Sequence, residues 1–260
     1  MPAQKRNYQD VNSKTWDNWV KNGIEWSIPI THNEYVHALK GDWGVYLTPS
    51  RHVPKEWFPD FKHADLLGLV SGGGQQMPIF SALGAKCTVF DNSDSQLERE
   101  RMVSEREGYA INIVKGDMTK RLPFEDDTFD VIFHPVSNCY IEDVCHVWRE
   151  CFRVLKKGGV LLAGMDNGMN FLFDDSFTVP LTVANKLPFN PVKNATEAEY
   201  KRMVENDEGI QFSHSLEEQL GGQLKAGLIL TDLFEDRDRE GSGILRDYTP
   251  QYIATRAIKP

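Results

Sequence analysis

The sequence predicts an α/β fold in which a mostly parallel β-sheet carries helices on both faces. From residue 63 onward, short apolar runs alternate with segments of helical pattern. The first run leads into three consecutive glycines, Gly72, Gly73 and Gly74, and the second run ends on Asp91. Strands separated by helices of this length favour parallel pairing through right-handed crossovers. A glycine turn after the first strand is typical of a ligand pocket at the carboxyl edge of such a sheet.

Most of the expected elements have their own start or stop signals. Gly84, Gly108 and the pair Gly158-Gly159 follow three helical patterns, and glycine readily adopts the left-handed conformation that ends a helix. Ser93 with Gln96 three residues later matches a capping box, which predicts a helix start. We expect strands over residues 64–70, 87–90, 111–114, 129–133 and 160–163, and helices over residues 77–83, 93–107 and 144–155.

Residues 1–60 differ in composition from the rest of the chain. They hold scattered prolines, two short helical patterns over residues 11–20 and 33–39, and five of the six tryptophans: Trp16, Trp19, Trp26, Trp43 and Trp57. One interpretation is an arm that packs its aromatic side chains on the main domain. We favour the other, an aromatic lid over a ligand pocket, because such lids exclude water from reacting groups. Residues 61–260 then form the main domain.

The last third of the chain is less regular. Residues 166–215 contain an aromatic, proline-bearing stretch that we interpret as an irregular insertion covering the pocket. Helices are expected over residues 197–206 and 216–226. Residues 228–234 and 252–258 alternate apolar and polar side chains, which predicts a closing pair of strands.

Composition narrows the classes of partner and compartment. The chain has 260 residues, 40% of them hydrophobic, and a net charge of -9. An acidic chain is not drawn to phosphate backbones, so we do not expect nucleic acid as a partner. No apolar run is long enough to span a bilayer, and the first residues lack the apolar stretch of a signal peptide. We therefore expect a cytoplasmic protein of undetermined oligomeric state.

The four cysteines are expected to be reduced, buried thiols. Three of them, Cys139, Cys145 and Cys151, recur every six residues, which differs from the Cys-x-x-Cys pairs of zinc sites. Cys87 stands alone in the second strand. We predict no metal site.

The glycine turn does not match the common nucleotide fingerprints. Its glycines let a backbone pass close to a ligand, and the following helix start offers N–H groups to an anion. However, Met77 takes the third glycine position of the dinucleotide pattern Gly-x-Gly-x-x-Gly. Gln75-Gln76 stands where a triphosphate-binding loop needs lysine and a hydroxyl residue. Both nucleotide interpretations therefore lose support.

Several further motifs occur in order along residues 64–165. They are residues 67–74, Asp91, Gly116-Asp117-Met118, residues 122–132 and residues 153–159. On these motifs the chain resembles the class I S-adenosylmethionine-dependent methyltransferases. The resemblance implies a Rossmann-like sheet of seven strands with a reversed last strand, and S-adenosylmethionine as cofactor, with S-adenosylhomocysteine as product.

The resemblance also assigns roles within the cofactor site. Asp91 would hold the ribose hydroxyls, and Asp117 with Met118 would form the adenine site. The other residues expected at the cofactor are Ser71, Gly72, Gly73, Gly74, Gln75, Asn92, Gln96 and His134. Structural alternatives stay open for three of these features: the glycines as a tight turn only, Asp91 as a helix N-terminal charge, and Asp117 as a turn former.

Two positions depart from the family pattern. Gly68 stands where the first motif usually carries an acidic residue, and Val70 stands where it usually carries a glycine. The missing carboxylate removes one partner of the cofactor's ammonium group. Backbone carbonyls of the loop or a residue of the lid would have to replace it.

The segment after the fourth strand bears on the acceptor of the methyl group. Family members that methylate nucleic-acid bases carry Asn/Asp-Pro-Pro-Tyr/Phe there, and this chain has His134-Pro135-Val136-Ser137. His134 could be a general base, a wall of the cofactor pocket, or a purely structural residue.

Together these features predict a methyltransferase that uses S-adenosylmethionine to methylate a small molecule. An alternative is a regulatory module that binds the cofactor without turnover. A nicotinamide-dependent reductase is disfavoured by the missing third glycine.

Overall fold

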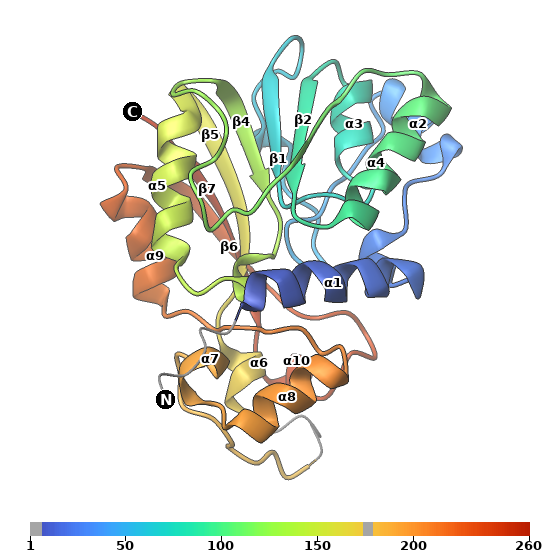
Figure 1. The fold of residues 1–260 in the computed structure, drawn as a ribbon. Helices are drawn as coiled ribbons and strands as arrows, with labels where there is room; N and C mark the ends of the chain where they lie inside the picture. The colour runs from blue at the N-terminus through green and yellow to red at the C-terminus, as the bar shows by residue number, and fades with distance from the viewer. Residues whose placement is uncertain (1–6, 174–178) are drawn as a thin grey trace.

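The computed structural model describes residues 7–173 and 179–260 (Figure 1). Within these residues, seven strands form one sheet in the order β3-β2-β1-β4-β5-β7-β6. The strands β1 to β5 pair in parallel, whereas β7 runs antiparallel to both of its neighbours. The strands are β1 (Asp65–Leu69), β2 (Lys86–Asp91), β3 (Asn112–Lys115), β4 (Phe129–His134), β5 (Leu155–Asp166), β6 (Ile229–Asp236) and β7 (Tyr252–Ile258). The expected sheet with its reversed last strand is thus confirmed.

Helices cover both faces of this sheet (Figure 1). On one face lie α2 (His32–Leu39), α3 (Met77–Ala82) and α4 (Asp94–Glu107), and on the other lie α5 (Val144–Val154) and α9 (Leu216–Lys225). The strands feed two apolar cores by alternation: in β1, Leu66 enters the first core and Leu67 the second.

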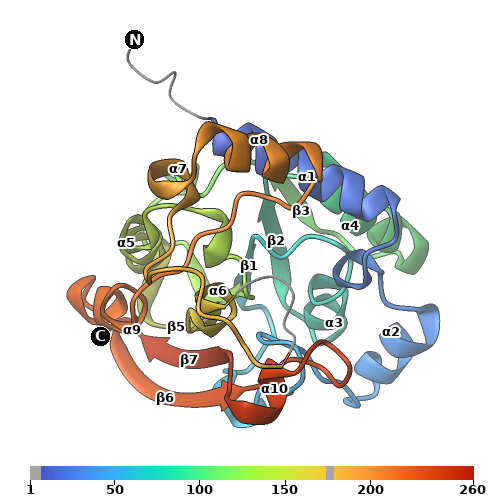
Figure 2. The same ribbon diagram turned by 90° about the horizontal axis from the view of Figure 1, so that it is seen from below.

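The remaining helices belong to a cover at the carboxyl edge of the sheet. Figure 1 shows α1 (Tyr8–Lys21) directly beneath the strand ends, and Figure 2 views the same elements from below. The other members of the cover are α6 (Met169–Leu172), α7 (Pro191–Asn194), α8 (Glu197–Glu205) and α10 (Leu245–Tyr248), with the 3-10 turns η1 (Glu25–Ser27) and η3 (Asn138–Tyr140). A third turn, η2 (Lys55–Trp57), packs beside the sheet.

The expected elements are present with shifts of at most three residues at their ends, except for β5, and the short helices α6, α7 and α10 were not expected. β5 extends over 12 residues, well beyond the expected 160–163, because it pairs with β7 from Val160 to Asp166. The short α10 lacks the periodic pattern that would have predicted it.

The capping box predicted at Ser93 is only half formed. The Ser93 hydroxyl accepts a hydrogen bond from the Gln96 N–H at 3.1 Å, as expected. The Ser93 N–H, however, donates to Oδ1 of Asp91 at 3.0 Å. The Gln96 side chain therefore does not accept this N–H, as it would in a complete capping box. That side chain lies at the cavity described below.

The tryptophans of residues 1–60 divide between two environments. Trp43 packs edge-on against Phe58 and Phe61 in the core, and Trp57 is buried against Phe234. Trp16 and Trp26 instead line the cavity at the carboxyl edge. Part of the segment therefore packs on the sheet, and part lies over the strand ends.

Candidate functional site

A cavity of about 1530 Å³ lies between the carboxyl edge of the sheet and the cover. Its floor comes from the residues that follow β1, β2 and β4 and from the end of β5. Its walls come from α1, from residues 26–34 and 44–49, and from the chain between β5 and β7. Eight predicted site residues line it: Ser71, Gly72, Gln75, Asp91, Asn92, Gln96, Asp117 and Met118.

The glycine turn is held from beneath rather than open to an anion. The N–H of Gly72 donates to Asp91 Oδ2 at 3.1 Å, and the N–H of Gly73 donates to the Gln96 carbonyl at 3.1 Å. The N–H of Gly74 donates to Glu100 Oε1 at 2.7 Å. These three N–H groups are therefore not available to an anion, and the expectation of free N–H groups concerns the start of α3, at Met77. Gly73 and Gly74 do not line the cavity, and they support the turn from below.

Asp91 ends β2 at the floor of the cavity. Its carboxylate is 6% exposed and accepts the N–H groups of Gly72 and Ser93. Burial raises the pKa of this carboxyl to about 6. Each carboxylate oxygen accepts more than one hydrogen bond, so Asp91 keeps capacity for hydroxyl donors in the cavity.

Gly72 allows a ligand to approach this carboxylate. A Cβ at this position would lie 3.0 Å from Asp91 Oδ2 and 2.8 Å from Gln96 Cβ. Any side chain at position 72 would therefore occupy the space between Asp91 and Gln96. Gln96 is buried, and its Oε1 accepts no hydrogen bond from a described residue. This leaves an unused acceptor at the cavity.

Asp117 and Met118 form the wall next to Asp91. The Asp117 carboxylate accepts the Thr119 N–H and the Thr119 hydroxyl, both at 2.8 Å. It therefore shapes its own turn, as the structural alternative predicted, and also lines the cavity. Met118 is buried beside it.

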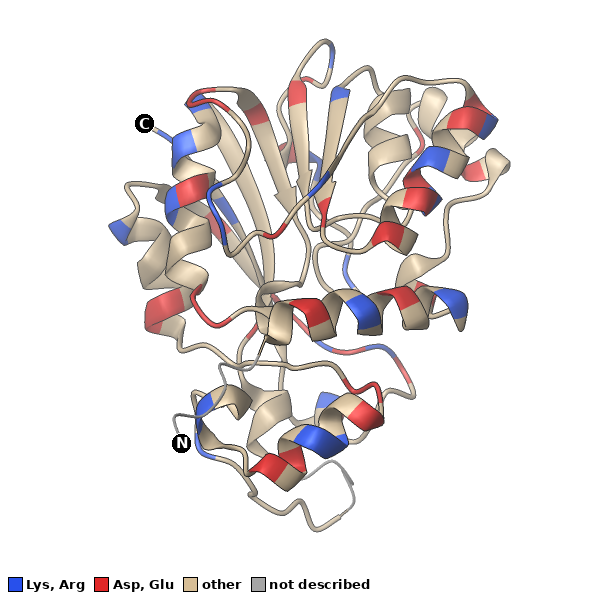
Figure 3. Ribbon diagram, viewed as in Figure 1, with Lys and Arg blue, Asp and Glu red and all other residues tan. Residues whose placement is uncertain are grey.

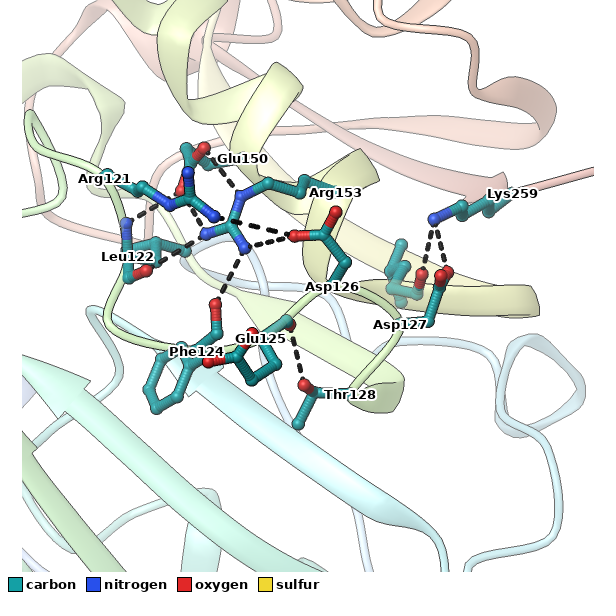
Figure 4. A network of polar contacts seen from close by, with 11 residues as sticks. Arg121, Leu122, Phe124, Glu125, Asp126, Asp127, Thr128, Glu150, Arg153 and Lys259 are labelled. Carbon is teal, nitrogen blue, oxygen red and sulfur yellow. Dashed lines mark hydrogen bonds and ion pairs between the residues drawn. The ribbon is translucent and has the colours of Figure 1, made fainter.

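The motif at residues 153–159 fixes the chain that follows this wall (Figure 4). The guanidinium of Arg153 donates to both carboxylate oxygens of Glu150, at 3.0 and 2.6 Å. It also donates to the carbonyls of Leu122 and Phe124 and to Asp126. Arg153 thus clamps residues 122–126 to α5 and has a structural role.

His134 does not line the cavity. Its side chain is fully buried, with Nδ1 2.9 Å from the Leu69 carbonyl oxygen and Nε2 2.8 Å from Asn138 Oδ1. Burial lowers its pKa. Because both ring nitrogens have partners inside the protein, this position does not provide a general base. The imidazole instead fixes the end of β4 to β1, and the cavity wall begins with the next residue, Pro135.

The two departures from the family pattern have structural counterparts. The space above Gly68 is filled by Met77, whose thioether would lie 2.6 Å from a Cβ on Gly68. Val70 adopts the left-handed conformation, with φ at 51°, which is rare for a β-branched residue. The backbone therefore keeps the shape that glycine normally provides, while the acidic side chain is replaced by an apolar one.

Side chains of α1 join the cover to the sheet. Asp17 accepts the Ser93 hydroxyl at 2.7 Å and the Ser95 N–H at 2.9 Å, at the start of α4. Ser13 donates to the Asn92 carbonyl at 2.9 Å. Gln75 ties the glycine turn to the carbonyls of Glu25 and Ile28. The cover is thus attached at both the turn and the end of β2.

Asp166 is a buried carboxylate of the cavity that was not among the predicted site residues. Asp166 is the last residue of β5, lines the cavity and is 4% exposed. Its position after a predicted strand was a usable signal, because side chains after parallel strands meet at the same edge. Among the described residues, no group of three His, Cys, Asp or Glu side chains is placed to hold a metal ion. Nor does any helix in the described ranges have the length and apolarity to cross a membrane.

The described residues fit S-adenosylmethionine. Asp91 offers a buried carboxylate next to a glycine that leaves room for a ligand, and Gln96 offers an unused acceptor. Asp117 and Met118 provide a polar edge and an apolar surface on the adjoining wall. The N–H groups of Gly72 and Gly74 already donate to carboxylates of the protein, so they are not free to bind a phosphate group.

Comparison with known proteins identifies the family of the chain. The methyltransferase domain family matches residues 67–163. The chain is 43% identical over 250 residues to the uncharacterized methyltransferase YbaJ of Bacillus subtilis (strain 168), covering 95% of this chain and 97% of that protein. It is 36% identical over 90 residues to a sterol 24-C-methyltransferase of Aspergillus fumigatus, covering 34% of this chain and 24% of that protein.

The same fold occurs among solved structures. An S-adenosylmethionine-dependent methyltransferase from Mesorhizobium loti superposes with a TM-score of 0.59 at 16% identity, covering 78% of this chain and 94% of that chain. The similarity to YbaJ extends over nearly the whole of both chains. The chain therefore belongs to the class I S-adenosylmethionine-dependent methyltransferases.

Proposed function

We propose that this enzyme transfers the methyl group of S-adenosylmethionine to a small molecule held in the cavity. The observation that carries the proposal is the cover: α1 and described residues between β5 and β7 line the space next to the cofactor residues and lie over the strand ends. A macromolecular substrate would need an open surface at the strand ends. Trp16, Trp26 and Tyr140 line the enclosed space, which suits an acceptor with apolar surface.

The cofactor residues have distinct roles in this proposal. Asp91 accepts the ribose hydroxyls, and Asp117 with Met118 holds the adenine. Gln96 Oε1 is an unused acceptor beside the glycine turn, and we assign to it the role of the missing carboxylate at Gly68. When bound, S-adenosylmethionine supplies a methyl group activated by a positive sulfur. The protein then aligns the acceptor and excludes water, the task we assign to the lid of residues 1–60 and to the insertion.

Charge and composition support a small acceptor and an intracellular compartment. Both signs of charge occur along α1, α4 and α8, with no basic stripe on these helices (Figure 3). The net charge of -9 also gives no attraction to nucleic acid. The sterol methyltransferase that resembles part of this chain is named for a small apolar substrate. The four cysteines are free thiols, which fits the cytosol.

Cofactor binding and turnover are tested separately. Calorimetry with S-adenosylhomocysteine should show binding to the wild type and a loss of about 1–3 kcal/mol in Asp91→Ala, because a hydrogen-bonded charged partner is removed. Asp60→Ala changes an exposed aspartate and should bind normally. Unchanged affinity in Asp91→Ala would sink the role of Asp91.

Turnover is followed as S-adenosylhomocysteine released from S-adenosylmethionine. We expect release with a metabolite extract below 1 kDa and none with the macromolecular fraction. Cofactor binding without release from either fraction would favour the regulatory module. Release only with the macromolecular fraction would overturn the small-molecule acceptor. A larger thermal shift with a nicotinamide cofactor than with S-adenosylmethionine would revive the reductase.

A further inference from the structure

Asp166 carries a carboxylate oxygen that the fold leaves without a partner. Oδ1 accepts the Gly168 N–H at 3.0 Å, whereas Oδ2 accepts no hydrogen bond from any described residue. The residue is 4% exposed and lines the cavity. A buried polar atom without a partner is costly, so natural proteins keep one mainly where function needs it.

The backbone around Asp166 is rigid. Asp166 is paired with Tyr252 in the β5–β7 ladder, and the Asn167 N–H donates to the Gln251 carbonyl at 2.9 Å. The Asn167 side chain donates to the Pro250 carbonyl at 2.9 Å and accepts the Met169 N–H at 3.1 Å. A carboxylate at the end of a strand, fixed in this way, is held in one position.

Aromatic side chains line the cavity alongside Asp166. Tyr252 comes from β7, Tyr140 from η3 and Phe171 from α6. Phe171 stacks on Phe189 with ring centroids 5.9 Å apart. A methyl acceptor that lies among such rings buries most apolar surface when it has a flat apolar body. The carboxylate of Asp166 then adds one polar contact.

We propose that Asp166 selects the acceptor by accepting a hydrogen bond, through Oδ2, from an O–H or N–H group on a flat aromatic body. The inference rests on the proposed function and narrows its small molecule to this class. Asp91 and Asp117 belong to the cofactor side of the cavity. Asp166 differs from the other lining carboxylates because it is buried, whereas Glu34 and Glu199 are exposed and Glu208 and Asp238 are half-buried. In this proposal Asp166 contacts the methyl acceptor, and cofactor binding does not depend on it.

Among the titratable groups around Asp166, only its own carboxyl is expected to change charge near neutral pH. Burial raises its pKa to about 7. Burial raises the pKa of Cys139, Tyr140 and Tyr252, and the charge of Asp166 raises each of them further, so all three stay neutral. Asp238, which also lines the cavity, further raises the pKa of Tyr252. The strength of the contact to a donor should therefore increase between pH 6 and pH 8, because a charged acceptor binds a donor more strongly.

Two probes of similar shape test the proposal without knowledge of the natural acceptor. Fluorobenzene has no donor, and phenol has one that stays protonated over this pH range. Fluorine NMR measures fluorobenzene bound to the protein saturated with S-adenosylhomocysteine, and phenol is then used to displace it. We expect phenol to bind about tenfold more tightly than fluorobenzene at pH 8, with a smaller preference at pH 6.

Asp166→Asn is the decisive variant. Its Oδ1 can still accept the Gly168 N–H, while its amide nitrogen replaces Oδ2 and cannot accept a hydrogen bond. We expect the preference for phenol to disappear at both pH values, with affinity for S-adenosylhomocysteine unchanged. Asp247→Asn, an exposed aspartate of α10 outside the cavity lining, is the matched control and should behave as wild type.

The outcomes that overturn the proposal differ from those that overturn the proposed function. A wild-type preference that is absent or independent of pH, or one that persists in Asp166→Asn, overturns the role of Asp166. Loss of S-adenosylhomocysteine binding in Asp166→Asn does so as well, because it would place Asp166 in the cofactor site. A wild-type protein that binds no S-adenosylhomocysteine overturns the proposed function itself.

Discussion

Asn12 of α1 pairs through both ends of its amide with the backbone of Ile210, a residue 198 positions further along the chain. Its Nδ2 donates to the Ile210 carbonyl at 2.9 Å, and its Oδ1 accepts the Ile210 N–H at 2.7 Å. Nδ2 also donates to the Tyr140 carbonyl at 3.1 Å. One buried side chain thus joins three parts of the cover: α1, η3 and the insertion.

Replacing Asn12 with Ala should loosen the cover without altering the sheet. The change leaves the buried N–H and C=O of Ile210 unpaired, so we expect the free energy of unfolding to fall by about 1–3 kcal/mol. Hydrogen exchange should become faster in α1 and around residue 210 and stay unchanged in β1. Denaturant titration and exchange mass spectrometry measure the two effects. Asn112→Ala, at an exposed position of β3, is the control, and an equal loss in both variants would contradict the role of Asn12.

Gly164, near the end of β5, should not tolerate alanine. A Cβ at this position would lie 2.1 Å from the backbone carbonyl oxygen of Leu47, which belongs to the chain that lines the cavity. Backbone on both sides cannot yield easily, so Gly164→Ala should lower the melting temperature and weaken binding of S-adenosylhomocysteine. The expected loss of stability is about 2 kcal/mol or more.

Gly221 of α9 provides the opposite case. A Cβ there would meet only Glu217 Cγ, at the ordinary contact distance of 3.6 Å. Gly221→Ala should therefore stabilise the protein by about 0.5–1 kcal/mol, since alanine favours a helix. Similar melting temperatures for the two variants would show that Leu47 moves aside readily.

Sequence patterns predicted the sheet because strand and helix periodicities are local properties of the chain. The apolar runs and the glycine stops located each strand of the parallel part within three residues at most ends, and the acidic residue after the second run lies at the cavity as expected. What escaped prediction depends on contacts between distant segments. The full length of β5 toward Asp166 follows from its ladder with β7, although the place of Asp166 after a predicted strand was a local signal for the cavity edge.

His134 and Gln96 show the same limit at single side chains. His134 follows an apolar strand, and nothing local indicates that Asn138 and the Leu69 carbonyl enclose its ring. Gln96 has the spacing of a capping residue, but Asp91 has taken the N–H that it would have capped. In both cases a polar partner from another element decides the role.

Because the backbone at Val70 is left-handed, a glycine variant should be more stable than an alanine variant at this position, which reverses the usual order of stability. Val70→Ala and Val70→Gly remove the same isopropyl group, so the difference between them isolates the backbone conformation. At φ 51° glycine is strain-free and alanine is not, and we expect Val70→Gly to be more stable than Val70→Ala by about 1 kcal/mol. Denaturant titration of both variants measures the difference. Ala82→Gly in α3 should instead destabilise by about 1 kcal/mol, and the same sign at both positions would contradict the assignment.

Glu100 should make the protein less stable as the pH rises from 6 to 8. This carboxyl is fully buried under the glycine turn, where Oε1 accepts the Gly74 N–H and Oε2 accepts no hydrogen bond from a described residue. Burial raises its pKa to about 8, from 4.5 in the unfolded chain. The folded state therefore holds a proton that the unfolded state has lost, and the stability gained from this group below pH 4.5 is lost as the pH rises toward 8.

The comparison of Glu100→Gln with wild type isolates this effect from all other titrations. Glutamine can still accept the Gly74 N–H and carries no charge, so the free energy of unfolding of the wild type should fall by about 2 kcal/mol relative to the variant between pH 6 and pH 8. Urea titrations at three pH values provide the measurement. Glu105→Gln lies on the exposed side of the same helix and should follow the wild type. A parallel pH dependence of wild type and Glu100→Gln would mean that Glu100 is ionised in the folded protein, with its charge stabilised at the glycine turn.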